Sequence, residues 1–231
     1  MAAASSRRFF LSAARGGWHF HRMAAQFLNR LATVRQGAYL PHWTLDGAIY
    51  HSVFRLADAL PAAVIARYRR ERAALLVEAG EHPSCDTHDR LRQLFSERIE
   101  RLLDAGQGAC WLAQPKIAEV IAGALRHFDG ERYRLHAWCV MPNHVHAVVQ
   151  PTSRHELSGI LHSWKSFTAN EANGILGRAG EFWQKESYDH LVRDAADLER
   201  TIRYVQENPV SAGLINWCWV WPGQVASASS R

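Results

Sequence analysis

Long apolar runs and paired cysteines are both missing from this chain. No hydrophobic segment approaches the roughly 20 residues that a membrane-spanning helix needs, so we expect no membrane partner. The four cysteines (Cys85, Cys110, Cys139 and Cys218) form no C-x-x-C pair, and no zinc-binding spacing is visible. A reducing, cytoplasmic compartment is therefore the simplest expectation.

Acidic residues are absent from the first 45 positions, which contain six arginines. The rest of the chain has a net charge of −1 within an overall charge of +5, so the body has no bulk electrostatic footprint for nucleic acid. We interpret residues 1–38 as a basic N-terminal arm outside the fold. Three interpretations of the arm stay open: an organelle transit peptide, a DNA-contacting arm, or an over-extended start with Met23 as the initiator.

The remaining composition is that of one globular domain. The chain has 231 residues, of which 48% are hydrophobic and 21% charged, and we place the domain at residues 39–224, followed by a frayed tail at 225–231. Periodicity and turn residues predict the following elements: a strand at 48–56, a helical hairpin inserted at about 61–105, a helix at 116–128, strands at 129–140 and 144–149, a helix at 155–173 with Trp164 and Phe167 inward, an extended segment at 180–192, and a helix at 193–209 stopped by Pro209. This order predicts an α+β fold in which helices pack on an antiparallel sheet.

Two histidines interrupt the apolar segment "AWCVMPNHVHAVVQ". Side chains alternate across a strand, so His144 and His146 point to one face and Val145 and Ala147 to the other. Two imidazoles that converge on one point can bind a divalent metal. A pair of histidines on a solvated sheet face has the same spacing, so this motif alone leaves both interpretations open.

A second group of polar residues lies in the last predicted helix, "LERTIRYVQENPV". Tyr204 and Asn208 are four residues apart and so share a helical face. At 100° per residue, that face lies outside the apolar stripe centred near Leu198. Tyrosine is a poor nucleophile at neutral pH because its pKa is near 10. It attacks a phosphodiester when the developing charge is neutralised, which two histidines and an amide holding Mg²⁺ or Mn²⁺ would achieve.

These segments resemble a known family. "MPNHVH", followed by "FWQKESYDHLVRD" and "YVQENPVSAGL", is similar to the single-tyrosine His-hydrophobe-His (HUH) transposases, and most of all to the bacterial REP-associated tyrosine transposases. The resemblance extends over roughly residues 39 to 216. The ending "NWCWVWPGQVASASSR" and the long basic arm depart from the family pattern.

The resemblance implies a ferredoxin-like sheet, a metal pair formed by His144 and His146, and Tyr204 as the nucleophile. Asn208 would be the third metal ligand. The implied activity is a metal-dependent transposase that nicks and rejoins single-stranded, hairpin-forming repeat DNA through a 5′-phosphotyrosine intermediate. The protein would then be a monomer or homodimer at the bacterial nucleoid.

Several DNA contacts and rivals stay open at this stage. Candidate phosphate contacts are Lys165, Lys185 and Arg193, and Trp183 is a candidate for stacking on a base. Tyr188 is a rival nucleophile. The rival functions are a domesticated hairpin-binding protein that does not cut DNA, and a phosphoesterase that uses water and forms no tyrosyl adduct.

Overall fold

The computed structural model describes residues 33–36, 41–44, 47–80 and 85–222. Its strands and helices, in chain order, are as follows: β1 (Thr33–Gln36), β2 (Pro41–Thr44), β3 (Tyr50–Arg55), α2 (Ala62–Ala79), α3 (Cys85–Phe95), the π-helix η1 (Ser96–Glu100), α4 (Arg101–Asp104), the 3₁₀-helix η2 (Trp111–Ala113), α5 (Pro115–His127), β4 (Tyr133–Val140), β5 (His144–Pro151), α6 (Leu157–Leu176), β6 (Tyr188–Leu191), α7 (Ala195–Ser211) and β7 (Val220–Pro222).

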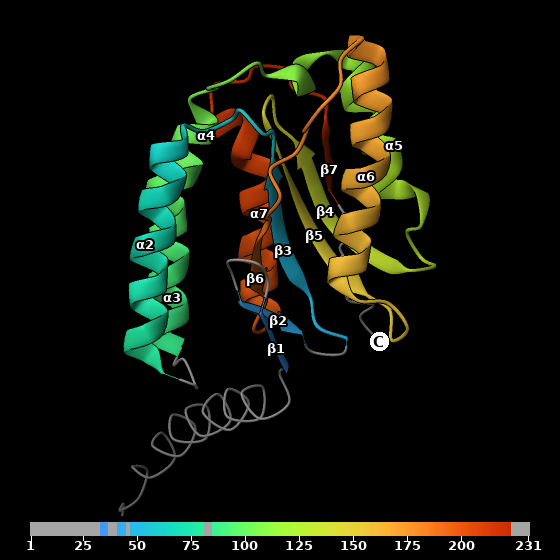
Figure 1. The fold of residues 1–231 in the computed structure, drawn as a ribbon. Coiled ribbons are helices and arrows are strands. Elements are labelled where there is room, and N and C mark those ends of the chain that lie inside the picture. Colours follow the sequence, from blue (N-terminus) through green and yellow to red (C-terminus); the bar gives the residue numbers. More distant parts are fainter. Residues whose placement is uncertain (1–32, 37–40, 45–46, 81–84, 223–231) are drawn as a thin grey trace, which may run out of the picture.

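The main sheet is antiparallel and has the strand order β6-β3-β5-β4-β7. Removing the edge strand β7 leaves a unit β3-α5-β4-β5-α6-β6, in which the first strand pairs with the third and the fourth. This is the ferredoxin-like arrangement, so the predicted α+β fold class is confirmed. The predicted inserted hairpin is present as α2 and α3–α4, between β3 and α5 (Figure 1).

One face of the sheet is apolar and is covered by α5 and α6 (Figure 1). Phe54 of β3 lies 6.4 Å from Trp164 of α6 and 4.9 Å from Trp183, measured between ring centroids. The Trp164 indole N–H donates to the Tyr133 hydroxyl at 2.9 Å, so this large ring is buried without an unpaired polar atom. This face holds most of the hydrophobic core.

The opposite face is covered by α7, with the α2–α4 hairpin beside it (Figure 1). Val205 of α7 packs against Ala137, Cys139 and Val148 of the sheet. Helix α7 begins after Asp194, whose carboxylate accepts a hydrogen bond from the Asp197 backbone N–H at 2.8 Å. The Val205 contacts hold α7 over β4 and β5, and the Asp194 cap fixes where the helix begins.

The structure differs from the sequence predictions in several places. Strand β1 lies before Tyr39, where we expected the arm, and neither β2 nor β7 was predicted. Pro209 lies inside α7, which continues to Ser211, because a proline in the last turn removes only one helical hydrogen bond. Phe167 is 53% exposed rather than inward. The rest of the arm, residues 1–32 and 37–38, and the tail at 225–231 lie outside the described residues.

None of the helices in the described part of the chain combines the length and apolar character that crossing a membrane requires.

Candidate active site

The predicted histidine pair lies at the centre of the sheet, on the face toward α7. His144 and His146 are both fully buried, and their Nε2 atoms are 2.9 Å apart. Val145 and Ala147 occupy the other face, within the main core, as strand alternation requires. The pair therefore does not lie on a solvated surface, which was the alternative interpretation of the motif.

Neighbouring loop residues orient the first imidazole. His144 Nδ1 is 2.7 Å from Asn143 Oδ1, and Asn143 Nδ2 donates to the carbonyls of Leu103 and Gln107. Because the Asn143 oxygen can only accept, His144 Nδ1 carries the proton and its Nε2 has a free lone pair. The two carbonyls that hold Asn143 belong to the end of the inserted hairpin (Leu103) and to the loop after it (Gln107).

A third histidine, His51 of β3, completes the row, and the sequence analysis missed it. Its Nε2 lies 3.0 Å from His146 Nδ1, and the two rings are stacked with centroids 5.3 Å apart. Metal-binding histidines usually bond through the second ring nitrogen to a group that fixes their orientation. His51 occupies that position beside His146. The sequence carried no signal for this contact, because it depends on the register in which β3 pairs with β5.

All three imidazoles are neutral near pH 7. Burial lowers the pKa of His144 to about 3, and Arg55 contributes to the same shift. Burial, and then His190, lowers the pKa of His51 to about 3. The pKa of His146 is also well below its usual value because of burial and its two histidine neighbours. A neutral imidazole has one unprotonated nitrogen with a free lone pair, and this is the form that binds metals.

Helix α7 brings the predicted tyrosine and asparagine to the same place. The Tyr204 ring lies edge-on to His146 and His51, with centroids 5.8 Å and 5.9 Å away. Tyr204 is 37% exposed, whereas Asn208 is 3% exposed and its Oδ1 has no hydrogen-bond partner. Asn208 lies one helical turn after Tyr204, on the same face of α7. The four residues singled out from two distant sequence segments thus lie together.

The inserted hairpin adds two carboxylates that the sequence analysis did not single out. Asp104 Oδ1 lies 3.9 Å from His144 Nε2 and has no hydrogen-bond partner. Burial, and then Glu100, raises the pKa of Asp104 to about 6. Glu100 is buried and interacts with the Tyr204 hydroxyl. Both acids lie one helical turn apart, so they face the site together.

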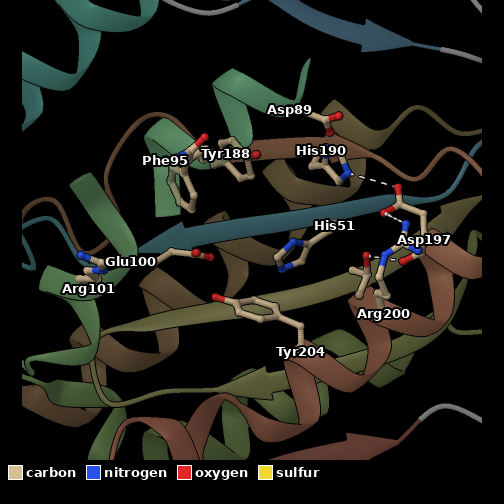
Figure 2. A pocket seen from close by; sticks show the side chains of 12 residues that line it. His51, Asp89, Phe95, Glu100, Arg101, Tyr188, His190, Asp197, Arg200 and Tyr204 are labelled. Carbon is tan, nitrogen blue, oxygen red and sulfur yellow. Dashed lines mark hydrogen bonds and ion pairs between the residues drawn. The ribbon is translucent and has the colours of Figure 1, made fainter. Parts of the chain in front are cut away.

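A cavity of about 740 Å³ opens beside Tyr204, between the hairpin, α7 and the strands β3 and β6. Figure 2 shows Glu100 and Arg101 at one end of it, with His190, Asp197 and Arg200 at the other. The cavity is large enough for part of an extended nucleotide chain.

The donor set fits a divalent ion. Two ligands at right angles, each about 2.1 Å from an ion, are about 3.0 Å apart, and the Nε2 atoms of His144 and His146 are 2.9 Å apart. Two buried oxygens nearby, Asp104 Oδ1 and Asn208 Oδ1, have no hydrogen-bond partner. In the described ranges, no three His, Cys, Asp or Glu side chains converge closely enough to hold an ion by themselves.

The three predicted DNA contacts differ in how they present their charge. Lys165 Nζ donates to the backbone carbonyls of Gln184 at 2.7 Å and Lys185 at 2.8 Å, so two of its three donors are used inside the protein. Arg193 pairs with Asp89 at 3.2 Å and with Asp197 at 3.5 Å. Lys185 pairs with Glu181 at 3.8 Å, but its side chain is 80% exposed, so its charge stays accessible from solvent.

The rival aromatic residues have packing partners. The Tyr188 ring stacks on Phe95 with centroids 3.7 Å apart and an interplanar angle of 9°, at the wall of the cavity. Trp183 is buried, and its indole N–H donates to Thr168 Oγ1 at 2.9 Å. A base cannot stack on a ring that is already enclosed, so the structure does not favour Trp183 as a stacking platform.

Comparison with known proteins finds a family match for part of the chain. Residues 113–208 match the family model described as IS200-like transposase. The family resemblance predicted from the sequence is confirmed. This matched region contains His144, His146, Tyr204 and Asn208, but it begins after β3 and the inserted hairpin and so includes neither.

Two individual proteins are similar to the chain. A REP-associated tyrosine transposase of Haemophilus influenzae is 27% identical over 96 residues, which cover 37% of this chain and 54% of that protein. The match therefore spans about half the length of that relative. A solved structure of a REP-associated tyrosine transposase bound to a REP hairpin has a TM-score of 0.44 and 14% identity, over 80% of this chain and 82% of that one.

Proposed function

We propose that this protein is a metal-dependent transposase that nicks and rejoins single-stranded, hairpin-forming repeat DNA through a 5′-phosphotyrosine intermediate. The observation that carries the proposal is the convergence of Tyr204 and Asn208, from α7, on His144 and His146, from β5. The match to the IS200-like transposase family supports it, as does the similarity to a REP-associated tyrosine transposase.

The ion would be held by His144, His146 and Asn208, with Asp104 beside them. A bound Mg²⁺ or Mn²⁺ supplies charge neutralisation at the scissile phosphate. His51 and Asn143 hold the two imidazoles in the orientation that keeps their Nε2 atoms together. Burial of all these groups excludes water, which strengthens their electrostatic effect on a phosphate.

Tyr204 is the nucleophile in this proposal. Its oxygen bonds to phosphorus while the bond to the 3′-oxygen breaks, which leaves a 5′-phosphotyrosine link and a free 3′-OH. The 3′-OH of a second strand then displaces the tyrosine and rejoins the DNA. Tyr204 suits this role because it is partly exposed at the cavity and lies beside the metal-binding face. Tyr188 suits it less because its ring is stacked on Phe95.

The DNA would enter through the cavity beside α7. We propose that Lys185 provides a phosphate contact, since its charge is exposed. Arg193 becomes available if phosphate displaces Asp89 from it. Lys165 contributes indirectly, by holding the backbone of residues 184–185 in place.

The test uses a labelled single-stranded oligonucleotide with a repeat hairpin from the flanks of the gene. The oligonucleotide is incubated with protein and Mn²⁺ and separated on a denaturing gel. We expect a covalent DNA–protein band that is lost with EDTA and in Tyr204→Phe but kept in Tyr188→Phe. Tight hairpin binding on a native gel without any covalent band would instead identify a hairpin-binding protein that does not cut. Cleavage without a covalent species would identify a phosphoesterase that uses water.

A further inference from the structure

The inserted hairpin carries an acid that none of the family features includes. Glu100 is the last residue of the π-helix η1, where α3 passes into α4. It is 7% exposed, although carboxylates are rarely buried without a partner. Single turns of π-helix inside α-helices occur frequently at functional sites because they shift the side chains that follow. This turn directs Glu100 inward, to the wall of the cavity beside α7.

The partner of Glu100 is the proposed nucleophile. Figure 2 shows the Tyr204 hydroxyl and the Glu100 carboxylate directed toward each other across the cavity. Both side chains line the same cavity. A carboxylate can accept a proton from a hydroxyl that faces it, and this is the placement that general base catalysis requires.

Tyr204 needs such a group. The pKa of a tyrosine hydroxyl is ordinarily near 10. The hydroxyl is therefore protonated near pH 7, and its proton must leave as the oxygen attacks.

The other groups near Tyr204 are less suited to this role. His51 Nε2 and His146 Nδ1 bond to each other, and Asp104 lies 3.9 Å from His144 Nε2, beside the proposed metal position. Asn208 is not basic. The cations at the cavity, Arg101 and Arg200, cannot accept a proton.

We propose that Glu100 is the general base of the strand-cleavage step. As the Tyr204 oxygen bonds to phosphorus and the bond to the 3′-oxygen breaks, the tyrosine proton passes to the Glu100 carboxylate, and the leaving 3′-oxygen takes a proton from solvent. In the rejoining step the incoming 3′-OH releases its proton to solvent, and Glu100 returns the stored proton to Tyr204. This inference rests on the proposed function, and it makes the hairpin part of the active site.

The test compares Glu100→Gln with the wild-type protein and with Glu78→Gln. Glutamine keeps the size of the side chain and can still accept a hydrogen bond from Tyr204, but it is not basic. Glu78 belongs to the same hairpin, is exposed, and forms an ion pair with Arg90 at 3.1 Å, so its variant controls for loss of a hairpin carboxylate. The rate of covalent adduct formation is measured from pH 6 to pH 9.5, with hairpin binding and the melting temperature measured alongside.

We expect Glu100→Gln to bind the hairpin normally. It should form the adduct at least about 100-fold more slowly, which is the usual contribution of a general base. Its rate should rise with hydroxide concentration across the range, whereas the rates of wild type and Glu78→Gln level off. A wild-type rate and pH profile in Glu100→Gln would overturn the inference and leave the proposed function intact. A slow rate with an unchanged pH profile would make Glu100 a positioning residue instead. Absence of adduct in the wild type would overturn the proposed function and the inference together.

Discussion

The two faces of the main sheet are built from the same strands and have opposite chemistry. On β3 and β5, Phe54, Val145 and Ala147 face α5 and α6 in the main core. The alternate residues of the same strands include the buried histidines His51 and His146, which face α7. The period of two in a strand allows one segment to stabilise the fold on one side and to carry chemistry on the other.

The polar face is stabilised differently from the apolar one. The imidazoles of His51, His144 and His146 each bond to another side chain, and a buried polar group without a partner costs about 1–3 kcal/mol. Asp104 Oδ1 and Asn208 Oδ1 are among the buried atoms that have no hydrogen-bond partner. Both are carboxylate or amide oxygens, which a cation could satisfy.

The largest expected effect on stability is on the apolar face. Phe54→Ala removes a fully buried ring that contacts Trp164 and Trp183, and should lower the free energy of unfolding by about 3–5 kcal/mol. Urea denaturation measures this loss. Phe167→Ala, at an exposed position on α6, is the control and should change the free energy by about 0.5 kcal/mol or less. Equal losses in the two variants would contradict the core described above.

Acid should destabilise the polar face next. The pKa values of His51 and His144 are about 3 in the folded protein and about 6.5 when unfolded. The unfolded chain therefore binds more protons below pH 6.5, and the free energy of unfolding falls as the pH drops. Asp104 acts in the opposite sense between about pH 6 and pH 4, because its pKa is raised. His146, whose pKa is also lowered, adds to the histidine effect. Three histidines less one carboxyl leave two net protons, so the loss approaches about 2.7 kcal/mol per pH unit.

Denaturation curves for the metal-free protein at pH 7, 6 and 5 measure this slope, and His51→Gln should make it shallower. A free energy of unfolding that is constant between pH 7 and pH 5 would show that the histidines are not buried in their neutral form.

Metal affinity should respond to His51 even though it is not one of the proposed ligands. His51→Gln disturbs the bond that orients His146, and such changes typically weaken metal binding about 10- to 100-fold. Isothermal titration with Mn²⁺ measures the affinity. His136→Gln is the matched control, because His136 is half-buried on β4 and bonds to Gln150, away from the site. Equal affinities for all three proteins would leave His51 with a packing role alone.

The smallest expected effects are those of substitutions at Lys185 and Lys165, and the two should differ in kind. Lys185→Ala should weaken hairpin binding by less than about 1 kcal/mol and reduce its salt dependence by about one phosphate contact. Lys165→Met should leave DNA affinity unchanged but lower the free energy of unfolding by about 1 kcal/mol, since it loses two hydrogen bonds to backbone carbonyls. Fluorescence anisotropy at several salt concentrations checks both, and a larger loss of affinity in Lys165→Met would reverse the assignment.

Most of the elements were predictable because their signals are local. The alternation around Val145 and the helical periodicity around Val205 depend on near neighbours in the chain. Residue spacing was therefore enough to predict that His144 and His146 share a sheet face. It was also enough to predict that Tyr204 and Asn208 share a helical face. The prediction for Phe167 was wrong because a helical stripe wider than the covered surface leaves its edge exposed. Strand β7 was missed because a three-residue strand has too few residues to show a period.

The sequence by itself determined the fold class and the pairs His144–His146 and Tyr204–Asn208, since each pair lies within one element whose geometry sets their direction. Only the tertiary structure brought these two pairs together and added His51, Glu100 and Asp104 to them. Those three residues lie outside the region that matches the transposase family. They reach the site from β3 and from the inserted hairpin, and His51 is separated from His146 by 95 residues in the chain. A local sequence period does not record which distant segments will meet.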